Sequence, residues 1–396
     1  MDRQALQKRL LTWFRTHRRD LPWRRTRDPY AIWVSETMLQ QTQVATALPY
    51  YERFLAHFPT IRALAAATDQ QVLKAWQGLG YYRRATNLHK AARAVVREHG
   101  GRVPDDPAAM AALPGVGRYT CGAVLSIAYG RPLAALDGNA VRVIARWLGI
   151  TACVDDAATR RTLWQAAEAL VPQPGGMPRP SLPGHGRRGK THAHAKSGVG
   201  MPPHDANLPG DWNQAVMELG SRVCLPRGPR CDACPVRRLC RAAADGLQDR
   251  IPRRRRRKPV PHIEVGAGIV WRRGRVLLCK RKADAMLGGL WEFPGGKRRR
   301  GESIQACIRR ELREECDLAV TVGEHLVDVT HTYSHLRVTL RCWHCRAGPG
   351  RVRRLGCDEA RWVRPEEIAN FPLPAADVKI LEAMANDMAR RRRRPS

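Results

Sequence analysis

The chain has no run of 18 consecutive apolar residues, the length that a membrane-spanning helix requires. Its N-terminal segment also lacks the apolar core of a signal peptide, so we expect a cytoplasmic protein with no membrane partner. Acidic residues are scarce, because 36 Asp and Glu stand against 69 Lys and Arg, for a formal net charge of +33. This excess favours a polyanionic partner, with nucleic acid ahead of an anionic membrane surface.

Hydrophobic residues make up 43% and charged residues 27% of the 396 positions, which is typical of globular proteins. At roughly 150 residues per domain, this length predicts about two or three domains. Twelve cysteines in a reducing compartment argue against a disulfide framework and direct attention to metal binding.

Apolar residues recur at helical spacing through residues 1–171, which are therefore predicted to be mainly helical. Residues 172–211 are rich in Pro, Gly and His, and we interpret them as a disordered surface insertion rather than a metal site. The basic run that follows the cysteine cluster predicts an interdomain linker. The expected division is a first domain over 1–246, a linker over 247–262, a second domain over 263–389 and a basic tail over 390–396.

The second domain is predicted to be α+β. Residues 265–271 and 275–279 flank a short glycine-containing turn, as in a β-hairpin. A helical pattern covers residues 303–315, and further strands are expected at 324–332 and 336–345.

Four cysteines follow the spacing C-x6-C-x2-C-x5-C, at Cys224, Cys231, Cys234 and Cys240. Four thiolates so close in sequence can surround one soft metal centre, and both zinc and iron–sulfur clusters accept such a set. The spacing resembles the iron–sulfur loop of the endonuclease III and adenine DNA glycosylase superfamily. That resemblance implies one 4Fe–4S cluster with a structural and DNA-docking role.

The segment L-P-G-V-G-R-Y, ending at Tyr119, lies between two helical patterns. Two glycines let the backbone turn sharply and present N–H groups to an anion such as a DNA phosphate. The segment resembles the helix-hairpin-helix of the same superfamily. The expected DNA-binding residues here are Gly115, Val116, Gly117 and Arg118.

Two carboxylates are candidate catalytic groups. Asp137 precedes a helical pattern and could be an ordinary N-cap or a catalytic carboxylate facing DNA. Glu36 is the one acidic residue in an otherwise uncharged stretch from 30 to 51, so its pKa could be raised enough to donate a proton. An exposed helix glutamate is the alternative.

The sequence motifs around Glu36 resemble those of the adenine DNA glycosylase family. They are W-V-S-E-x-M-L-Q-Q-T-Q, G-L-G-Y-Y-x-R-A at 78–85 and N-L-H-K-A-A at 87–92. The resemblance runs from about residue 21 to 171 and resumes at 212. It implies that Glu36 protonates adenine N7 and later handles the attacking water, and that Asp137 stabilises or traps the cationic sugar. The adenine must first leave the base stack.

The resemblance assigns further roles. Tyr119 and Asn139 would support the two carboxylates, and Gln41 and Tyr81 would fill the gap and contact the opposite base. Lyase members of the superfamily carry a lysine where this chain has Tyr119, so a monofunctional glycosylase is expected. A lysine common in bacterial relatives is replaced by Val141, which argues against a trapped-lysine side reaction.

The pattern G-x5-E-x7-R-E-L-x-E-E-x-D-L from Gly296 resembles the Nudix box, with Asp317 in place of glycine. Glu311, Glu314 and Glu315 would share one helical face and could hold Mg²⁺. This second domain could hydrolyse an oxidised nucleoside triphosphate such as 8-oxo-dGTP.

Alternatively, the second domain recognises 8-oxoguanine through Tyr333, Ser334 and His335, which resemble the F-S-H loop of the family. We therefore expect a multidomain chain with an all-α helix-hairpin-helix glycosylase domain and an α+β Nudix-like domain. It would act as a monomer on double-stranded DNA that contains A:8-oxoguanine or A:G pairs, at the nucleoid. The competing hypotheses are an endonuclease III-like lyase and a non-catalytic DNA-binding scaffold.

Overall fold

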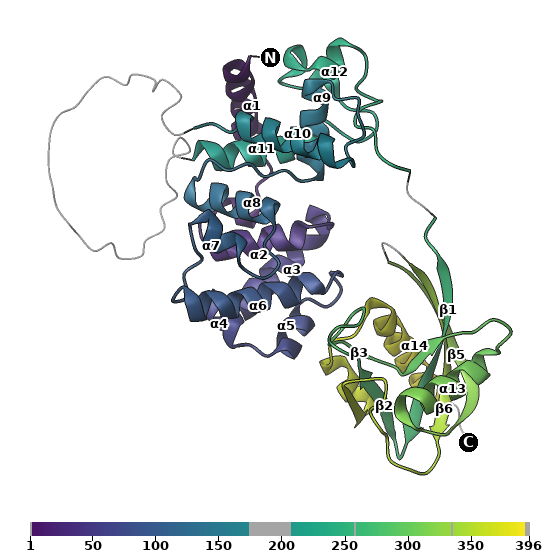
Figure 1. The fold of residues 1–396 in the computed structure, drawn as a ribbon. Helices are drawn as coiled ribbons and strands as arrows, with labels where there is room; N and C mark the ends of the chain where they lie inside the picture. Colours follow the sequence, from purple (N-terminus) through teal and green to yellow (C-terminus); the bar gives the residue numbers. More distant parts are fainter. Residues whose placement is uncertain (1, 174–206, 257–258, 334–335, 393–396) are drawn as a thin grey trace. The chain divides into compact units, whose positions relative to one another are not determined.

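The computed structural model describes residues 2–173, 207–256, 259–333 and 336–392 (Figure 1). Most of the predicted insertion therefore lies outside the described residues. The chain divides into two compact units, 1–40 with 97–256, and 41–96 with 257–396. Among the described residues, none of the helices has the length and apolar character needed to cross a membrane.

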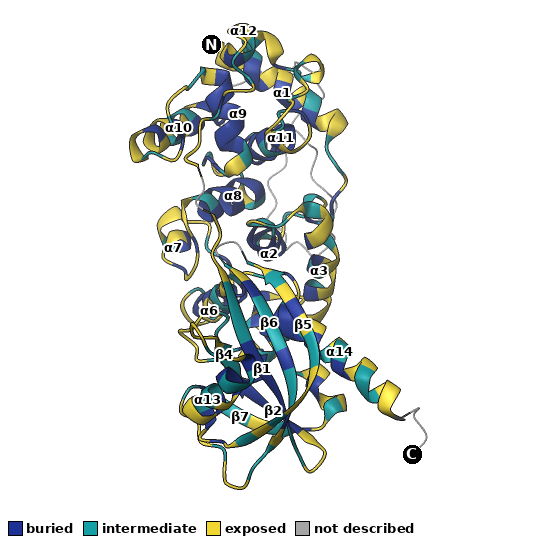
Figure 2. Cartoon of the chain, turned by 90° about the vertical axis from the view of Figure 1, so that its right-hand side faces the viewer, coloured by how far each residue is buried: buried dark blue, intermediate teal, exposed yellow. Residues whose placement is uncertain are grey.

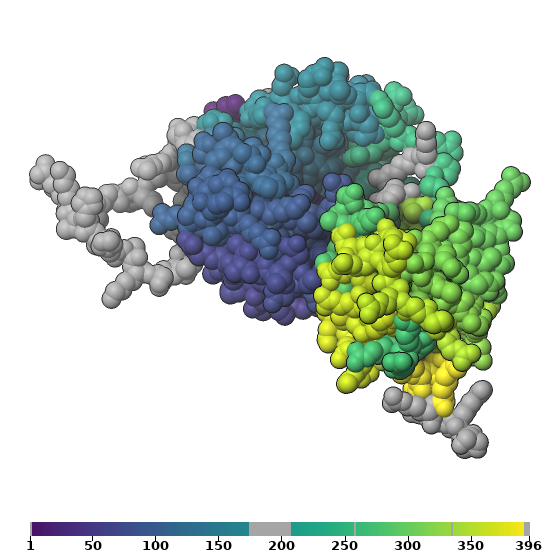
Figure 3. Space-filling view, turned by 60° about the horizontal axis from the view of Figure 1, so that its bottom comes forward, coloured from purple at the N-terminus to yellow at the C-terminus, as the bar shows by residue number. Residues whose placement is uncertain are grey.

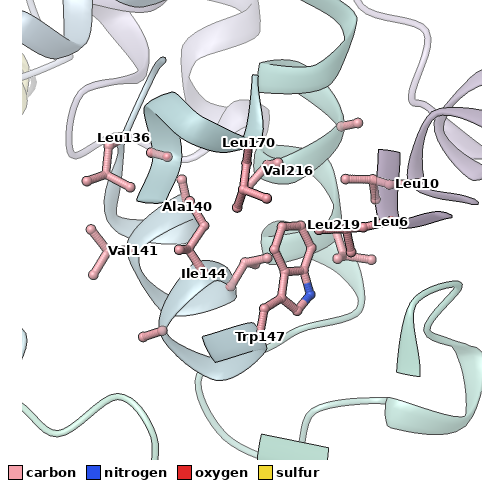
Figure 4. Packing of buried hydrophobic residues seen from close by; sticks show 14 of the residues in the cluster. Leu6, Leu10, Leu136, Ala140, Val141, Ile144, Trp147, Leu170, Val216 and Leu219 are labelled. Atoms are coloured by element: carbon pink, nitrogen blue, oxygen red, sulfur yellow. The ribbon is translucent and has the colours of Figure 1, made fainter. Parts of the chain in front are cut away.

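The first unit is helical. Apart from short 3₁₀ turns, its helices are α1 (Arg3–His17), α2 (Pro29–Leu39), α7 (Pro107–Ala111), α8 (Arg118–Tyr129), α9 (Gly138–Leu148), α10 (Ala157–Leu170), α11 (Leu208–Arg222) and α12 (Arg241–Ala244). Side chains from α1, α9, α10 and α11 pack into one core around Trp147 (Figure 4). Val141 is buried in this core, at the position where relatives were expected to carry lysine.

Helix α11 begins at Leu208, so the predicted end of the insertion at 211 is wrong. The Asn207 side chain accepts a hydrogen bond from the Gly210 amide and caps the helix. A Cβ atom on Gly210 would lie 2.6 Å from the Ser126 carbonyl oxygen, so only glycine permits this close approach. A Pro-Gly pair that suggests a loop in the sequence is therefore a buried helix start.

The second unit combines helices with one sheet. Its helices are α3 (Val44–His57), α4 (Ile61–Ala66), α5 (Asp69–Ala75), α6 (Arg83–Glu98), α13 (Ile304–Cys316) and α14 (Ala375–Arg392). Its strands are β1 (His262–Arg272), β2 (Arg275–Lys280), β3 (Trp291–Glu292), β4 (Gly295–Lys297), β5 (Val320–Thr332), β6 (Arg337–Ala347) and β7 (Glu359–Val363). The predicted hairpin, helix and two later strands correspond to β1–β2, α13, β5 and β6.

The sheet is mixed, with the order β3-β2-β1-β6-β5, and β4 and β7 pair with β1 and β2. Strands β1 and β6 run parallel, whereas the other pairs are antiparallel. Alternate side chains of β1 enter different cores, because Ile269 packs with α14 and Val270 packs with α13. Consecutive residues 266–270 of β1 are accordingly buried (Figure 2). Since neighbouring strands are distant in sequence, green and yellow segments interleave on the surface of this region (Figure 3).

Residues 41–96 belong to the same compact unit as the sheet, which differs from the predicted division at residue 246. The Gln70 side chain donates to the Gly289 carbonyl and accepts from the Trp291 indole, at 3.0 and 2.8 Å. The Tyr82 hydroxyl also donates to the Leu373 carbonyl. These contacts join segments more than 200 residues apart, which local patterning does not reveal.

Two predicted boundaries also change. Residues 247–256 belong to the first unit, because Ile251 is buried there and the Arg253 carbonyl accepts from the Val154 amide. The predicted linker is therefore wrong over those residues. The predicted tail from 390 begins inside α14, where Arg391 pairs with Asp387 and Glu324. Residues 390–392 therefore continue α14 instead of beginning a separate tail.

Candidate active site

Glu36 lies on α2, which Asp28 caps and in which Pro29 occupies the first turn. Nine of the eleven residues of this helix are buried, and Glu36 itself is 5% exposed. The Tyr119 hydroxyl, at the start of α8, donates a hydrogen bond to Glu36 Oε2 at 2.5 Å. The predicted exposed-helix alternative for Glu36 is thereby excluded.

The pKa of Glu36 is raised to about 7, chiefly because a carboxylate loses its hydration inside the protein. Within this net value, the hydrogen bond from Tyr119 lowers the pKa and the nearby charge of Asp137 raises it. Glu36 is therefore a carboxylic acid that can hold and release a proton near neutral pH.

Asp137 is the N-cap of α9, so the structural role considered for it is present. Its Oδ1 accepts from the Ala140 amide at 2.6 Å, and its Oδ2 accepts from the Asn139 side chain at 2.9 Å. Burial raises the pKa of Asp137, while the hydrogen bonds from Ala140 and Asn139 lower it. This carboxylate is half-buried and accepts two hydrogen bonds, so it is held in place to stabilise a positive charge that develops beside it.

The structure brings the two candidate carboxylates together. The charge of Asp137 acts on Glu36, and the charges of both acids act on the Tyr119 phenol, whose pKa burial raises well above its usual range. Tyr119 and Asn139 contact Glu36 and Asp137, respectively, as the predicted supporting roles require. One acid able to protonate and one able to stabilise a cation suit cleavage of a glycosidic bond.

Sequence reasoning missed a charged network beside this pair. Glu218 on α11 is completely buried and forms ion pairs with Arg19 and Arg24, which lower its pKa to about 2 although burial alone would raise it. The positive charge of Arg24 also lowers the pKa of Glu36. Met217 Sδ lies 3.5 Å from the Tyr119 hydroxyl. An acidic residue within the apolar pattern of α11 was the available signal.

The predicted hairpin connects α7 to α8. Gly115 has a φ of +76°, a left-handed conformation that favours glycine, and Gly117 precedes the first turn of α8 without a side-chain cap. The first amides of α8 are therefore available to an anion. Val116 is buried, whereas the Arg118 side chain is 56% exposed and forms a surface ion pair with Glu168.

Gln41 and Tyr81 belong to the second unit. Both are non-glycine residues with positive φ, at +59° and +49°, and Tyr81 is 42% exposed. Such strained backbone persists where the surrounding structure enforces it, often at functional sites. The Arg84 guanidinium lies over the Tyr81 ring, 5.2 Å from its centre. An exposed, strained aromatic residue fits the predicted wedge role.

The four predicted metal ligands follow α11 in one loop, and each is half-buried with a free thiol. Arg142 on α9 donates to the Cys224 carbonyl oxygen at 2.7 Å, and Arg146 donates to Cys224 Sγ at 3.2 Å. Arg142 also donates to Asn139 Oδ1, so a hydrogen-bonded path connects the loop to Asp137.

The chemistry of this donor set suits a metal centre. Burial, together with the charges of its three partner cysteines, raises the pKa of Cys234 to about 12, because neighbouring thiolates repel one another. A cationic centre would remove that repulsion. In the described residues the four sulfur atoms are not gathered into a metal-binding arrangement, so the set fits a metal centre by its chemistry and spacing and not by its geometry in this structure.

The carboxylates of the Nudix box converge on Arg310 of α13. This guanidinium forms ion pairs with Glu302, Glu311 and Glu314 at 2.6 to 3.0 Å. The hydrogen bond from Arg310 is the main cause that lowers the pKa of Glu302 to about 2.

Glu315 differs from the other acids, because burial and the charge of Glu292 raise its pKa to about 7. Asp317, where the motif has glycine, adopts a φ of +50° and ends α13 in the left-handed conformation. The turn therefore survives the substitution, since aspartate tolerates this conformation better than most residues.

Tyr333 directly follows β5. Its ring packs edge-on against His331, with the ring centres 4.5 Å apart, and its amide donates to the Leu336 carbonyl. Burial raises the pKa of Tyr333 to about 12. Ser334 and His335 lie outside the described residues.

Comparisons with known proteins agree with both parts of the prediction. Residues 34–169 match the HhH-GPD superfamily of base excision DNA repair proteins, and residues 266–383 match the NUDIX domain.

Adenine DNA glycosylases share similarity along most of the chain. The protein from Rattus norvegicus is 33% identical, with 96% of this chain and 78% of that protein covered. The protein from Homo sapiens is also 33% identical, with 95% and 73% covered. That from Buchnera aphidicola subsp. Acyrthosiphon pisum is 28% identical, with 85% of each chain covered.

The predicted fold class, a helical helix-hairpin-helix domain with a Nudix-like domain, is thereby confirmed. The predicted enzyme class, a base-excision repair DNA glycosylase, is confirmed as well. With this level of identity over nearly its whole length, the chain belongs to the adenine DNA glycosylase family.

Proposed function

We propose that this enzyme removes adenine paired with 8-oxoguanine or guanine in double-stranded DNA and leaves an abasic site. The observation that carries the proposal is the pairing of Glu36, a buried acid with a pKa of about 7, with the hydrogen-bonded carboxylate of Asp137. Acting as a monomer on nucleoid DNA is part of the same proposal.

In the proposed reaction, Glu36 donates its proton to N7 of an adenine that has left the base stack. The electrons of the N-glycosidic bond then pass to the base, and positive charge develops on the sugar. Asp137 stabilises that charge, and water adds to the anomeric carbon as Glu36 takes a proton from it. Tyr119 holds Glu36 in place but has no amine for a Schiff base, so the reaction ends at hydrolysis.

The groups that would hold DNA belong to several elements. The amides at Gly115 and Gly117 would bind a backbone phosphate at the start of α8. Tyr81, exposed and backbone-strained, would enter the base stack, and Gln41 would contact the opposite base. Because the chain carries a large positive charge, affinity should fall steeply with salt.

The cysteine loop would hold one 4Fe–4S cluster through Cys224, Cys231, Cys234 and Cys240. Bound there, the cluster would supply structural order and a cationic centre, without taking part in the chemistry of the base. Arg146 would keep its hydrogen bond to the Cys224 sulfur. Iron and sulfide analysis of the purified protein, with zinc measured alongside, distinguishes the cluster from a zinc site.

For the Nudix-like domain, we propose recognition of 8-oxoguanine by Tyr333, Ser334 and His335. The packing of the Tyr333 ring against His331, where burial raises the pKa of its hydroxyl, supports a role for Tyr333 as a rigid contact residue.

A second activity, hydrolysis of an oxidised nucleoside triphosphate, is favoured by the intact set of box carboxylates around Arg310. Glu311, Glu314 and Glu315 would hold Mg²⁺, which would supply charge for a pyrophosphate. Release of pyrophosphate or phosphate from 8-oxo-dGTP with Mg²⁺, compared with Glu314→Gln, tests this activity.

The test of the main proposal compares Glu36→Gln with Glu52→Gln, an exposed glutamate on α3. Single-turnover excision is measured on a duplex with one A:8-oxoguanine pair and on its A:G counterpart. We expect Glu36→Gln to lose about 10²- to 10⁴-fold in rate while DNA binding persists, because the proton donor is absent. Glu52→Gln should retain the wild-type rate, and equal rates for both variants would refute the mechanism.

A further inference from the structure

Three thiols of the Nudix-like domain meet at one point. Cys279 lies on β2, Cys316 ends α13, and Cys357 lies in the loop before β7. The sulfur atoms of Cys279 and Cys316 are 3.6 Å apart, and Cys357 is buried in the same side-chain cluster. None of the roles proposed above uses these residues.

The backbone holds Cys357 against its two partners. Within its loop, the Arg353 amide donates to the Cys316 carbonyl, and the Gly356 amide donates to the Glu315 carbonyl, at 2.9 and 3.0 Å. On the other side, the Asp358 amide donates to the Lys280 carbonyl. Since the folded chain has already restricted this loop, little conformational entropy opposes a bond between the sulfur atoms.

The three thiols differ in their access to small oxidants. Cys357 is 7% exposed, whereas Cys279 and Cys316 are 2% and 0% exposed. Cys357 also lies in a connecting segment, where small motions admit a water-sized molecule more readily than in a strand or helix. The first oxidation is therefore expected at Cys357, with a buried thiol positioned to react next.

We propose that this thiol triad is an oxidation site at which a hydroperoxide converts Cys357 and one partner, Cys316 or Cys279, into a disulfide. The Cys357 sulfur attacks a peroxide oxygen, and the O–O bond breaks. One water molecule departs, and Cys357 becomes a sulfenic acid. The partner sulfur then attacks that sulfur, the S–O bond breaks, and a second water leaves. The two thiols lose two hydrogens, and hydrogen peroxide is reduced to two waters.

Tryptic cleavage places each thiol in a separate peptide, spanning 276–280, 314–337 and 355–361. The full-length protein is treated with increasing hydrogen peroxide, alkylated, digested without reductant and analysed by mass spectrometry. We expect peptide 355–361 joined to 314–337 or 276–280, two hydrogens lighter than the sum and separated by reductant. If all three peptides carry only the alkylating label after peroxide treatment, the proposal is wrong.

Two variants sharpen the result. Cys357→Ser should reduce disulfide formation within the triad at least 10-fold. Cys345→Ser, a buried cysteine of the same core on β6, should leave it unchanged. A disulfide between Cys279 and Cys316 that forms in Cys357→Ser at the wild-type rate would overturn the role of Cys357. Because the peptide map uses the wild-type chain, it stands even if a variant folds poorly.

Discussion

Two acidic side chains, Glu36 in the first unit and Glu302 in the second, are prepared in opposite ways. Glu36 is buried beside a phenol and a second carboxylate, so its pKa rises to about 7. Glu302, in the Nudix box, is paired with Arg310, and its pKa falls to about 2. The same functional group is thus prepared as a proton donor at residue 36 and as an anion at residue 302. What surrounds a carboxylate determines its chemistry more than the motif that contains it.

The strongest way to break this comparison is to remove one carboxylate charge from each region. Asp137→Asn keeps a side chain able to cap α9 but cannot stabilise a cationic sugar, so excision should fall about 10²- to 10⁴-fold. Glu311→Gln should leave excision unchanged. Single-turnover rates on A:8-oxoguanine duplexes measure both variants, and comparable losses would show that the two sites are not functionally separate.

A smaller effect is expected in the pH dependence of excision. Glu36 must be protonated to act, so the rate should decline as pH rises through about 7. Tyr119→Phe removes a hydrogen bond that lowers the pKa of Glu36, so the alkaline decline should move to higher pH. Rates from pH 5 to 9 test this direction, and a decline displaced to lower pH contradicts the assigned role.

The same raised pKa affects stability. Between the usual value of 4.5 and about 7, the folded state holds a proton at Glu36 that the unfolded chain releases. The contribution of this residue to the free energy of unfolding therefore declines as pH rises through that window. The free energy of unfolding of the wild type should decline relative to that of Glu36→Gln as pH rises through this window, because only the wild type has a titratable group at residue 36. Denaturant titrations of both proteins at several pH values measure this difference.

The smallest expected effect concerns the Nudix box. Arg310→Met leaves Glu302, Glu311 and Glu314 without their shared cation. Since these groups are near solvent, we expect Tm to fall by no more than about 4 °C, with excision unaffected. Calorimetry measures the change, and Arg309→Met on the same helix is the control. A large loss of excision would mean that this network supports the glycosylase reaction.

Sequence patterning predicted most local elements and the neighbourhood of the candidate site. Short sequence motifs contain Glu36, Asp137 and the glycines of the hairpin. Such motifs can be interpreted locally, because caps, turns and ligand spacings depend on neighbours in the chain. The structure places Tyr119 against Glu36 and Asn139 against Asp137, as those motifs suggest.

The unpredicted features depend on distant contacts. Glu218 meets Arg19 and Arg24 across nearly 200 positions, and no local pattern specifies that a buried charge will find two partners. The grouping of residues 41–96 with the sheet depends on similar contacts, such as that of Gln70 with Trp291. The start of α11 was missed because Pro209 and Gly210 are typical of loops until tertiary packing selects them.

The packing of α10 and α11 has a consequence for how this chain can change in evolution. Leu170 and Trp212 reach the same core, so both ends of the intervening stretch are fixed by the packed helices. The core holds α10 and α11 together whatever chain joins them, so the length of that connection is under less constraint than the packed side chains at its ends.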